Sequence, residues 1–188
     1  MSIMRSHNME DNELIKACLK GNSKAQRLLF EKFSPLMMGV VLRYVSSKEK
    51  ANDVLQDGFI KVFKNLDKFN NQGSFEGWIR RIIINTALDQ LRKDKKFQKE
   101  VEIDDVSLSL SIDSNAIDLM QAEGLMQLIQ GLPEGYRTVF NLYAIEGYTH
   151  KEIGEFLDIA ENTSKSQYSR ARALLRDILK KAGIEREG

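Results

Sequence analysis

The segment 148–172 constrains the fold of this chain more than any other. Residues 148–158 have the pattern of a short helix, and Thr149 and Glu152 have the spacing of a capping box at its start. A short polar turn follows, and from Thr163 the chain has the pattern of a second helix that is basic on its outer side. Two short helices joined by a tight turn predict a helix-turn-helix.

The second of these helices has two contrasting faces. Its apolar face comprises Tyr168, Ala171, Leu174, Leu175, Ile178 and Leu179. Its polar face comprises Asn162, Lys165, Ser169, Arg172, Arg176 and Lys180. Basic side chains neutralise phosphates, and amide and hydroxyl groups near the start of such a helix can contact base edges. An ordinary solvated face is the alternative interpretation, but the capping box and the spacing of the turn favour DNA binding.

The remainder of the chain also favours helix. Only 2 of the 188 residues are proline, and 42% are hydrophobic, which is enough to form a core. The longest apolar run, 36–42, is far shorter than the ~18 residues that suggest a membrane span. The N-terminus lacks the apolar region of a signal peptide, and the single cysteine, Cys18, excludes an intramolecular disulfide. We therefore expect a soluble, cytoplasmic protein without membrane insertion.

The N-terminal half has the pattern of several amphipathic helices. Residues 10–33 predict two helices broken at Gly21-Asn22, and Pro35 is expected at a turn or at the first position of a separate helix over 36–45. In the helix predicted over 51–66, Leu55, Phe59, Val62, Phe63 and Leu66 form the buried face. Asp53, Asp57 and Ile60 face outward, where an apolar residue beside carboxylates would suit a docking partner.

A polar loop and a basic helix follow. Residues 69–74 predict a loop, and Ser74 is expected to cap a helix over 75–96. The predicted core residues of that helix are Ile79, Ile82, Ile83, Leu88 and Leu91, and its polar stripe is Arg81, Asn85, Arg92 and Lys96. A surface that combines cations, amides and aromatic rings favours the binding of unpaired bases. For Trp78 itself, packing in the core is the favoured interpretation.

Charge divides the chain into blocks. Residues 75–99 contain seven basic and three acidic residues, 100–123 contain seven acidic and no basic ones, and 163–181 contain six basic and one acidic. The stretch 97–115 has no helical period; an extended linker is favoured over a short strand. Helices are predicted over 117–129 and 136–145. Two basic patches separated by an acidic connector are typical of nucleic-acid binding.

Catalytic chemistry has little support in the sequence. The two histidines, His7 and His150, are far apart, and His150 has no neighbouring histidine or cysteine that would complete a metal site. Cys18 has the character of a small apolar residue. Neither of the glycine-rich phosphate-binding motifs, G-x-x-x-x-G-K-[ST] and G-x-G-x-x-G, is present. We expect no enzymatic activity, no metal and no cofactor.

Three stretches, in this order and at this spacing, resemble the bacterial extracytoplasmic-function (ECF) sigma factors, the smallest class of RNA polymerase specificity subunit. They are 53–63 (DVLQDGFIKVF), 75–92 (beginning FEGWIRRI) and 132–140 (LPEGYRTVF), the last running into the helix-turn-helix. The resemblance spans roughly 12–179. It implies an all-α protein with two small helical domains, 10–96 and 116–182, joined by a flexible acidic linker, 97–115.

The resemblance also implies the partners and the residues that meet them. Core RNA polymerase would bind, through the clamp helices of its largest subunit and its flap, with Asp53, Gln56, Asp57 and Ile60 facing the clamp helices. The minus-ten element would be captured as a melted strand by Asn70, Asn71, Gln72, Ser74, Arg80, Arg81, Asn85 and Arg92. The minus-thirty-five element would be bound as duplex by Asn162, Thr163, Lys165, Ser166, Gln167, Ser169, Arg170, Arg172 and Arg176. An anti-sigma factor that masks the two domains is a further expected partner.

The turn of the helix-turn-helix departs from the family pattern. Asp158 stands where glycine is usual, and aspartate tolerates the left-handed conformation better than most residues. Ala160 stands where the family often has a serine cap, so Asn162 is the expected cap of the second helix. Ser164 stands on the predicted buried face, where the family often has an apolar residue.

Two other functions were weighed. One is a DNA-binding regulator, such as a response-regulator output domain, that never becomes a polymerase subunit. The N-terminal half argues against it, because a receiver domain would alternate strands and helices around an acidic pocket. The other, an enzyme with an appended DNA-binding module, has almost no support in the sequence.

Overall fold

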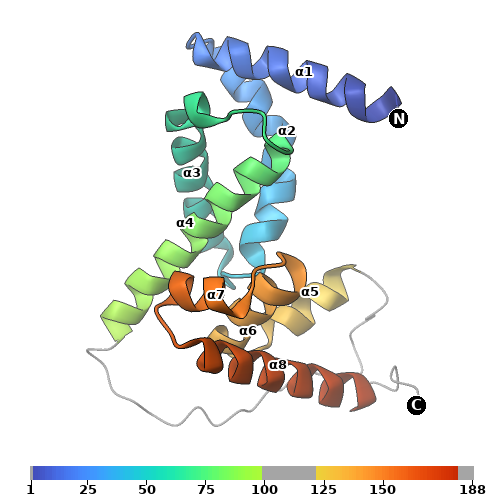
Figure 1. Ribbon diagram of the computed structural model, residues 1–188, viewed down its shortest axis with the longest axis vertical. Helices are drawn as coiled ribbons and strands as arrows, with labels where there is room; N and C mark the ends of the chain where they lie inside the picture. The colour runs from blue at the N-terminus through green and yellow to red at the C-terminus, as the bar shows by residue number, and fades with distance from the viewer. Residues whose placement is uncertain (1, 99–121, 182–188) are drawn as a thin grey trace. The chain divides into compact units, whose positions relative to one another are not determined.

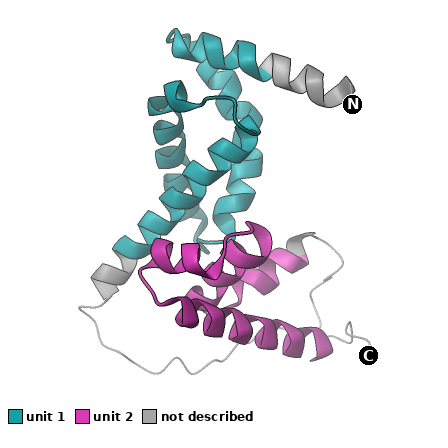
Figure 2. Cartoon of the chain, in the orientation of Figure 1, with its two compact units in different colours: residues 1–96 teal, residues 97–188 magenta. Residues whose placement is uncertain are grey.

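The computed structural model describes residues 2–98 and 122–181, and every regular element within them is helical. The helices are α1 (Ser2–Leu19), α2 (Ser23–Leu42), α3 (Lys48–Lys64), η1 (Leu66–Lys68), α4 (Phe75–Gln98), α5 (Ala122–Gln130), α6 (Glu134–Phe140), η2 (Asn141–Ile145), α7 (His150–Leu157) and α8 (Glu161–Lys181) (Figure 1). The predicted all-α fold class is confirmed. The chain divides into two compact units, residues 1–96 and 97–188 (Figure 2). Most of the predicted linker, 99–115, and the start of the helix predicted over 117–129 lie outside the described residues.

The first break in unit 1 falls where the sequence predicts it. Gly21 has a φ of 74°, and the Asn22 side chain then caps α2 by accepting hydrogen bonds from the backbone N–H groups of Lys24 and Ala25 at 3.0 and 3.1 Å.

The expected break at Pro35 is wrong, because α2 continues through it to Leu42. A proline inside a helix costs roughly 3 kcal/mol or more. The apolar face extends across the proline without interruption, and its buried residues on both sides outweigh that cost. They are Ala25, Leu29, Phe33, Met37, Val40 and Val41.

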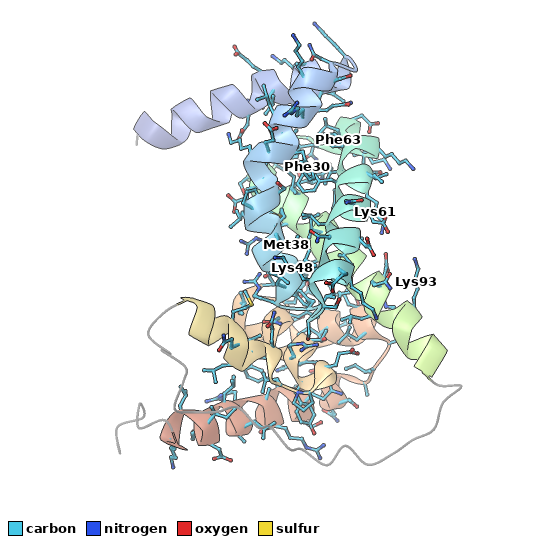
Figure 3. All side chains as sticks on the ribbon, turned by 180° about the vertical axis from the view of Figure 1, so that it is seen from behind. Phe30, Met38, Lys48, Lys61, Phe63 and Lys93 are labelled. Carbon is cyan, nitrogen blue, oxygen red and sulfur yellow. The ribbon has the colours of Figure 1, made fainter. Side chains whose placement is uncertain are left out.

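Helices α2, α3 and α4 form the core of unit 1. Phe30 of α2 meets Phe59 of α3 edge to face at 4.8 Å between ring centroids, and Phe30 and Phe63 lie between these helices in Figure 3. On α3, Gly58 lets Ile83 of α4 approach so closely that a Cβ there would lie 2.4 Å from Ile83 Cδ1. Helix α3 begins at Lys48, earlier than predicted, because Ser47 caps it.

The buried face of α4 is broader than predicted. Four of its five predicted core residues are buried, but Ile82 is only half-buried, while Ile84 and Thr86 are buried instead. The Thr86 hydroxyl donates to the Ile82 carbonyl at 2.8 Å, which satisfies that group inside the core. The buried face of α4 therefore extends from Phe75 to Leu91.

Unit 2 contains α5 to α8. Helix α6 begins at Glu134, two residues before the predicted start, because Pro133 precedes it and suits a helix entrance. It passes into the π-helical turn η2, and Gly147, with a φ of 78°, ends this segment as predicted. Buried Arg137 donates from Nη1 to the Gln130 carbonyl at 2.7 Å, so a cation satisfies the C-terminal end of α5. Burial lowers the pKa of Arg137.

No helix in the described parts of either unit has both the length and the apolar character that a membrane crossing requires.

Candidate polymerase and nucleic-acid interfaces

Helix α3 presents a continuous acidic stripe. Asp53, Gln56 and Asp57 are all exposed, and Ile60 beside them is 50% exposed. The opposite face of the helix is buried in unit 1. The structure therefore brings together all four residues that the sequence predicts for polymerase docking, on the helix that is held firmly by Gly58 and its neighbours.

The loop between η1 and α4 has a strained, specific conformation. The Asn70 side chain accepts from the Gln72 N–H at 3.1 Å, and Asn71 has a φ of 59°, which few residues other than glycine adopt. Gly73 follows at a φ of 90°. Ser74 then caps α4 as predicted, accepting from the Gly77 N–H at 3.0 Å. The four predicted loop residues, Asn70, Asn71, Gln72 and Ser74, are all exposed.

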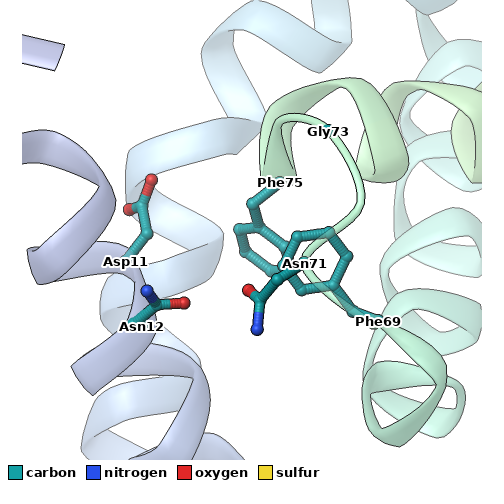
Figure 4. Close-up of a pocket in the computed structure, with 6 residues that line it drawn as sticks. All are labelled: Asp11, Asn12, Phe69, Asn71, Gly73 and Phe75. Atoms are coloured by element: carbon teal, nitrogen blue, oxygen red, sulfur yellow. The ribbon is translucent and has the colours of Figure 1, made fainter. Parts of the chain in front are cut away.

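Aromatic side chains pack against one another at the two ends of this loop. Phe69 contacts Phe75 and Trp78, with ring centroids 5.0 and 5.6 Å apart, and Trp78 is half-buried against Phe75. Beside these rings is a cavity of about 110 Å³ (Figure 4). Its lining residues are Asp11, Asn12, Phe69, Asn71, Gly73 and Phe75. Aromatic walls and amide groups in one hollow can hold a flat polar ring.

The two residues from α1 were not predicted to belong to this site. Asp11 is held by Lys32, whose Nζ lies 2.6 Å from its carboxylate. Asn12 is exposed and faces the loop in Figure 4. Nothing in the sequence pattern connects residues so distant along the chain, and only the packing of α1 brings them to the loop.

Downstream of the loop, the cations of α4 are paired with carboxylates. Arg92 lies 3.0 Å from Asp89, and Lys61 of α3 reaches the same carboxylate at 3.1 Å. Arg80 is half-buried and lies 3.9 Å from Glu76. Arg81 is exposed and Asn85 is half-buried. Arg81, Asn85 and Arg92 share one face by helical periodicity, whereas Arg80 lies to one side of it.

In unit 2, α7 starts and ends as the sequence predicts. The Thr149 hydroxyl accepts from the Glu152 N–H at 3.2 Å, and the Glu152 carboxylate accepts from the Thr149 N–H at 2.8 Å, which completes the capping box. At the other end Asp158 adopts the left-handed conformation, with φ 54° and ψ 50°.

Gly154 is essential to the turn, and the sequence analysis missed it. A Cβ on this residue would lie 2.8 Å from the backbone oxygen of Ile159, whose N–H donates to the Gly154 carbonyl at 3.0 Å. The chain thus crosses directly over α7 before α8 begins. A glycine inside an otherwise regular helical pattern was the available signal.

Helix α8 begins at Glu161, so the expected cap at Asn162 is wrong. The Ser164 N–H donates to the Ala160 carbonyl at 3.1 Å, which makes Ala160 the capping position. The close crossing at Gly154 fixes this start, and no side-chain cap is needed to specify it. Asn162 is instead an exposed residue of the first turn.

The nine predicted DNA-binding residues of α8 fall into two groups. Those on an exposed outer stripe are Asn162, Lys165, Ser166, Ser169, Arg172 and Arg176. The remaining three, Thr163, Gln167 and Arg170, lie on the flank next to α6. Gln167 is half-buried close to Gly135, and Arg170 Nη1 lies 3.4 Å from the Tyr136 hydroxyl.

Ser164 is completely buried, as the sequence predicts, and has a polar partner there. Its Oγ lies 2.9 Å from Nδ1 of His150, the first residue of α7. Burial lowers the pKa of His150, Lys165 lowers it further, and Glu161 acts in the opposite direction.

The sequence of each unit matches a family model. Residues 29–97 match Sigma-70 region 2, and residues 122–175 match Sigma-70 region 4. The chain is also 31% identical over 178 residues to the ECF RNA polymerase sigma-E factor of Escherichia coli K12, covering 89% of this chain and 93% of that protein.

This chain is an ECF sigma factor of the sigma-70 family.

Further comparisons are consistent with this assignment. The ECF sigma-E factor of Haemophilus influenzae is 28% identical over 178 residues, covering 89% of this chain and 94% of its own length. The fold is similar to that of the sigma factor RpoE from Bartonella quintana, solved in complex with the anti-sigma factor NepR (TM-score 0.51, 23% identity, 82% of this chain and 96% of that one). It is also similar to CnrH in complex with the cytosolic domain of CnrY (TM-score 0.50, 23% identity, 91% and 97%).

Membership of the family confirms the predicted function. The ECF sigma factor binds core RNA polymerase and promoter DNA and directs transcription initiation. Sigma factors are subunits without catalytic activity of their own, so the expectation that the chain is not an enzyme is also confirmed. The match of residues 29–97 to a sigma region excludes a receiver domain there, and with it that alternative.

Proposed function

We propose that the two units divide promoter recognition between a melted strand and a duplex. The domain over 10–96 holds polymerase and the minus-ten element, the linker over 97–115 connects the domains, and the domain over 116–182 holds the minus-thirty-five element. The observation that carries this proposal is the contrast between the aromatic cavity beside the loop at 69–74 and the outer stripe of α8.

The acidic stripe of α3 is the proposed polymerase contact. Asp53, Gln56 and Asp57 offer charge and hydrogen bonds, and Ile60 adds an exposed apolar group at the end of the stripe. Carboxylates around one apolar anchor suit a partner surface with basic residues around a hydrophobic spot.

The loop and α4 are the proposed minus-ten contacts. Asn71 lines the cavity, Asn70, Gln72 and Ser74 are exposed in the same loop, and the aromatic wall gives an unstacked base a surface on which to stack. Extruding a base costs a few kcal/mol, and stacking with amide hydrogen bonds offsets this cost. Arg80, Arg81, Asn85 and Arg92 then follow the phosphates along α4.

The outer stripe of α8 is the proposed minus-thirty-five contact. Asn162, Ser166 and Ser169 reach base edges near the start of the helix, while the basic residues contact phosphates. Of the three flanking residues, Arg170 reaches the DNA phosphate backbone, and Thr163 and Gln167 contact the DNA at the edge of the interface.

An anti-sigma factor is the proposed regulatory partner, and the cytoplasm is the proposed location. The similar sigma factor RpoE was solved with the anti-sigma factor NepR bound, which supports the first proposal. The polymerase and promoter that this family binds support the second. Affinity capture with the full chain, followed by competition with core polymerase, tests the partner. A captured protein that leaves polymerase binding unaffected would contradict a masking role.

Crosslinking tests the division of labour. Promoters are first obtained by transcribing a genomic library in vitro with this chain and bacterial core polymerase, and sequencing the RNA 5′ ends. Photocrosslinkers at Asn71 and Ser166 are then activated in the open complex. We expect Asn71 to label unpaired bases and Ser166 to label duplex further upstream. Labelling of duplex by both positions would refute the proposed division.

Charge reversal tests the docking stripe. Replacing Asp53 and Asp57 by Lys puts like charges against the proposed basic partner surface and should abolish co-purification with core polymerase. Asp67→Lys, which reverses an exposed carboxylate outside the stripe, should leave co-purification intact. Normal association of the double variant would eliminate this stripe as the contact.

A further inference from the structure

His150 occupies a structural position that the DNA contacts do not explain. It is the first residue of α7, yet its Nδ1 lies 2.9 Å from the hydroxyl of Ser164 on α8. Ser164 has no exposed surface. Either group can donate the proton that this contact needs, so one hydrogen bond joins the two helices of the helix-turn-helix inside the unit.

Aromatic rings hold the imidazole in place. Its ring is stacked on Tyr143 of η2, with centroids 4.1 Å apart and planes 10° apart. Tyr168 of α8 lies 5.8 Å from the same imidazole and 4.5 Å from Tyr143. The histidine therefore connects three elements, and the π-helical turn places Tyr143 against it.

Apart from the contact with His150, α8 is held by its apolar face and by Arg170, whose Nη1 lies 3.4 Å from the Tyr136 hydroxyl. Within its described part, only Ser164 and Ala171 are fully buried, and Tyr168 and the leucine and isoleucine residues are half-buried. Successive residues of a helix are about 100° apart around its axis. A small rotation would therefore replace Lys165 and Ser166 on the outer stripe with their neighbours.

We propose that His150 is a positioning residue for the recognition helix: its contact with Ser164 and its stack on Tyr143 set the rotation of α8, and thereby which side chains face the bases. This inference rests on the proposed duplex contact of α8. Because the contact requires a partly buried imidazole, sequence discrimination should depend on its charge.

Burial and two charged groups determine how this imidazole titrates, and the rings of Tyr143 and Tyr168 lie beside it. Lys165 repels a proton on the ring, and Glu161 attracts it. Burial and Lys165 lower the pKa of His150 below its ordinary value of 6.5. Above that value the ring is neutral, and its contribution is complete. As the pH falls through the lowered pKa, the ring becomes charged, and the contribution is lost.

Double substitution tests the contact. The probe is a pool of duplexes with a randomised central segment, bound by the full chain with core polymerase, recovered and sequenced. His150→Phe keeps a flat ring on Tyr143 but leaves the Ser164 hydroxyl without its partner, and Ser164→Ala does the converse. Each single variant should lower the preference for the enriched sequence about tenfold, and the double variant should also lose about tenfold and not a hundredfold, because both substitutions remove the same contact.

The pH dependence separates positioning from mere stability. As the pH falls from above 6.5 to below the pKa measured for His150, preference should fall in the original chain and in the control His7→Gln, but not in the double variant. Purely additive losses in the double variant, or a preference insensitive to every substitution, would overturn the inference. If the original chain enriches no sequence at all, both the proposed duplex contact of α8 and the positioning role of His150 are contradicted.

Nuclear magnetic resonance provides a measurement that needs no destabilised variant. The chain has 2 histidines, so His7→Gln leaves only the ring signals of His150. We expect a pKa below 6.5, an upward shift of that pKa in Lys165→Ala, and nuclear Overhauser contacts to the Tyr143 ring. An ordinary pKa without those contacts would overturn the proposal.

Discussion

The loop and α4 in unit 1 and the helix-turn-helix in unit 2 present two different kinds of polar surface. Around the loop, aromatic rings line an open cavity, and the backbone of Asn71 is held in a left-handed conformation. On α8 the nearest aromatic rings, Tyr143 and Tyr168, pack with His150 beneath the helix, and the outer stripe is polar and basic. The first surface is suited to binding an unstacked base, and the second is suited to binding the base edges and phosphates of the DNA major groove.

The two regions are also anchored differently. Helix α4 is buried along much of its length, from Phe75 to Leu91. Helix α8 is half-buried along its apolar face, and local devices set where it begins, namely Gly154, the left-handed Asp158 and the His150–Ser164 contact. Rigid support for α4 comes from a broad core, whereas the placement of α8 comes from the turn. Substitutions in the turn should therefore damage duplex recognition selectively.

Gly154→Ala should have the largest effect. Its methyl group would press on the Ile159 carbonyl, and such overpacking should destabilise unit 2 by about 2 kcal/mol. Duplex binding should fall strongly while unit 1 still unfolds normally, as measured by thermal unfolding followed at Trp78, the only tryptophan. Gly39→Ala on α2, where an added Cβ would have no atom within 4 Å, serves as the glycine control. If unit 2 of Gly154→Ala is as stable as unit 2 of the original chain, the turn can relax to accommodate the methyl group.

Asn71→Gly should have the next largest effect. Glycine keeps the left-handed backbone but removes the amide from the cavity, so opening of the promoter should weaken about threefold to tenfold through lost hydrogen bonds. Fluorescence of a 2-aminopurine in the melted strand measures this loss. Duplex binding by unit 2 should be unchanged. Gln127→Ala, an exposed amide on α5, is the control, and the proposal for the cavity fails if both variants behave alike.

Lys165→Ala should have a smaller effect, visible mainly in the salt dependence. Losing one phosphate contact should reduce the slope of log affinity against log salt by about one for the full chain with core polymerase. Lys24→Ala, an exposed lysine of unit 1, should not alter the slope. An unchanged slope in Lys165→Ala would assign this residue to its ion pair with Glu161 alone.

Asp158→Gly should have the smallest effect and the opposite sign. Glycine adopts the left-handed conformation without strain, so unit 2 should gain about 0.5 kcal/mol of stability. Calorimetry of the full chain measures the gain, and DNA preference should stay the same. A loss of stability would mean that the aspartate side chain contributes more than its backbone strain costs.

Local patterns predicted much of this molecule correctly. The break at Gly21-Asn22, the caps at Ser74 and Thr149, and the left-handed Asp158 all depend on residues close together in the chain. The outward stripe of α3 follows from helical period alone. Prediction failed where burial outweighed local preference, as at Pro35, and where the close packing of the turn on Gly154 set a helix boundary, as at Ala160.

The sequence by itself determined the helical class, the family and the polar faces, because capping, periodicity and motif spacing are properties of neighbouring residues. Only the tertiary structure decided that Asp11 and Asn12 line the loop cavity and that Ser164 meets His150. It also separated Gln167 and Arg170 from the outer stripe of α8. These contacts join residues far apart in the chain or on different helices, and their geometry depends on how whole faces pack together.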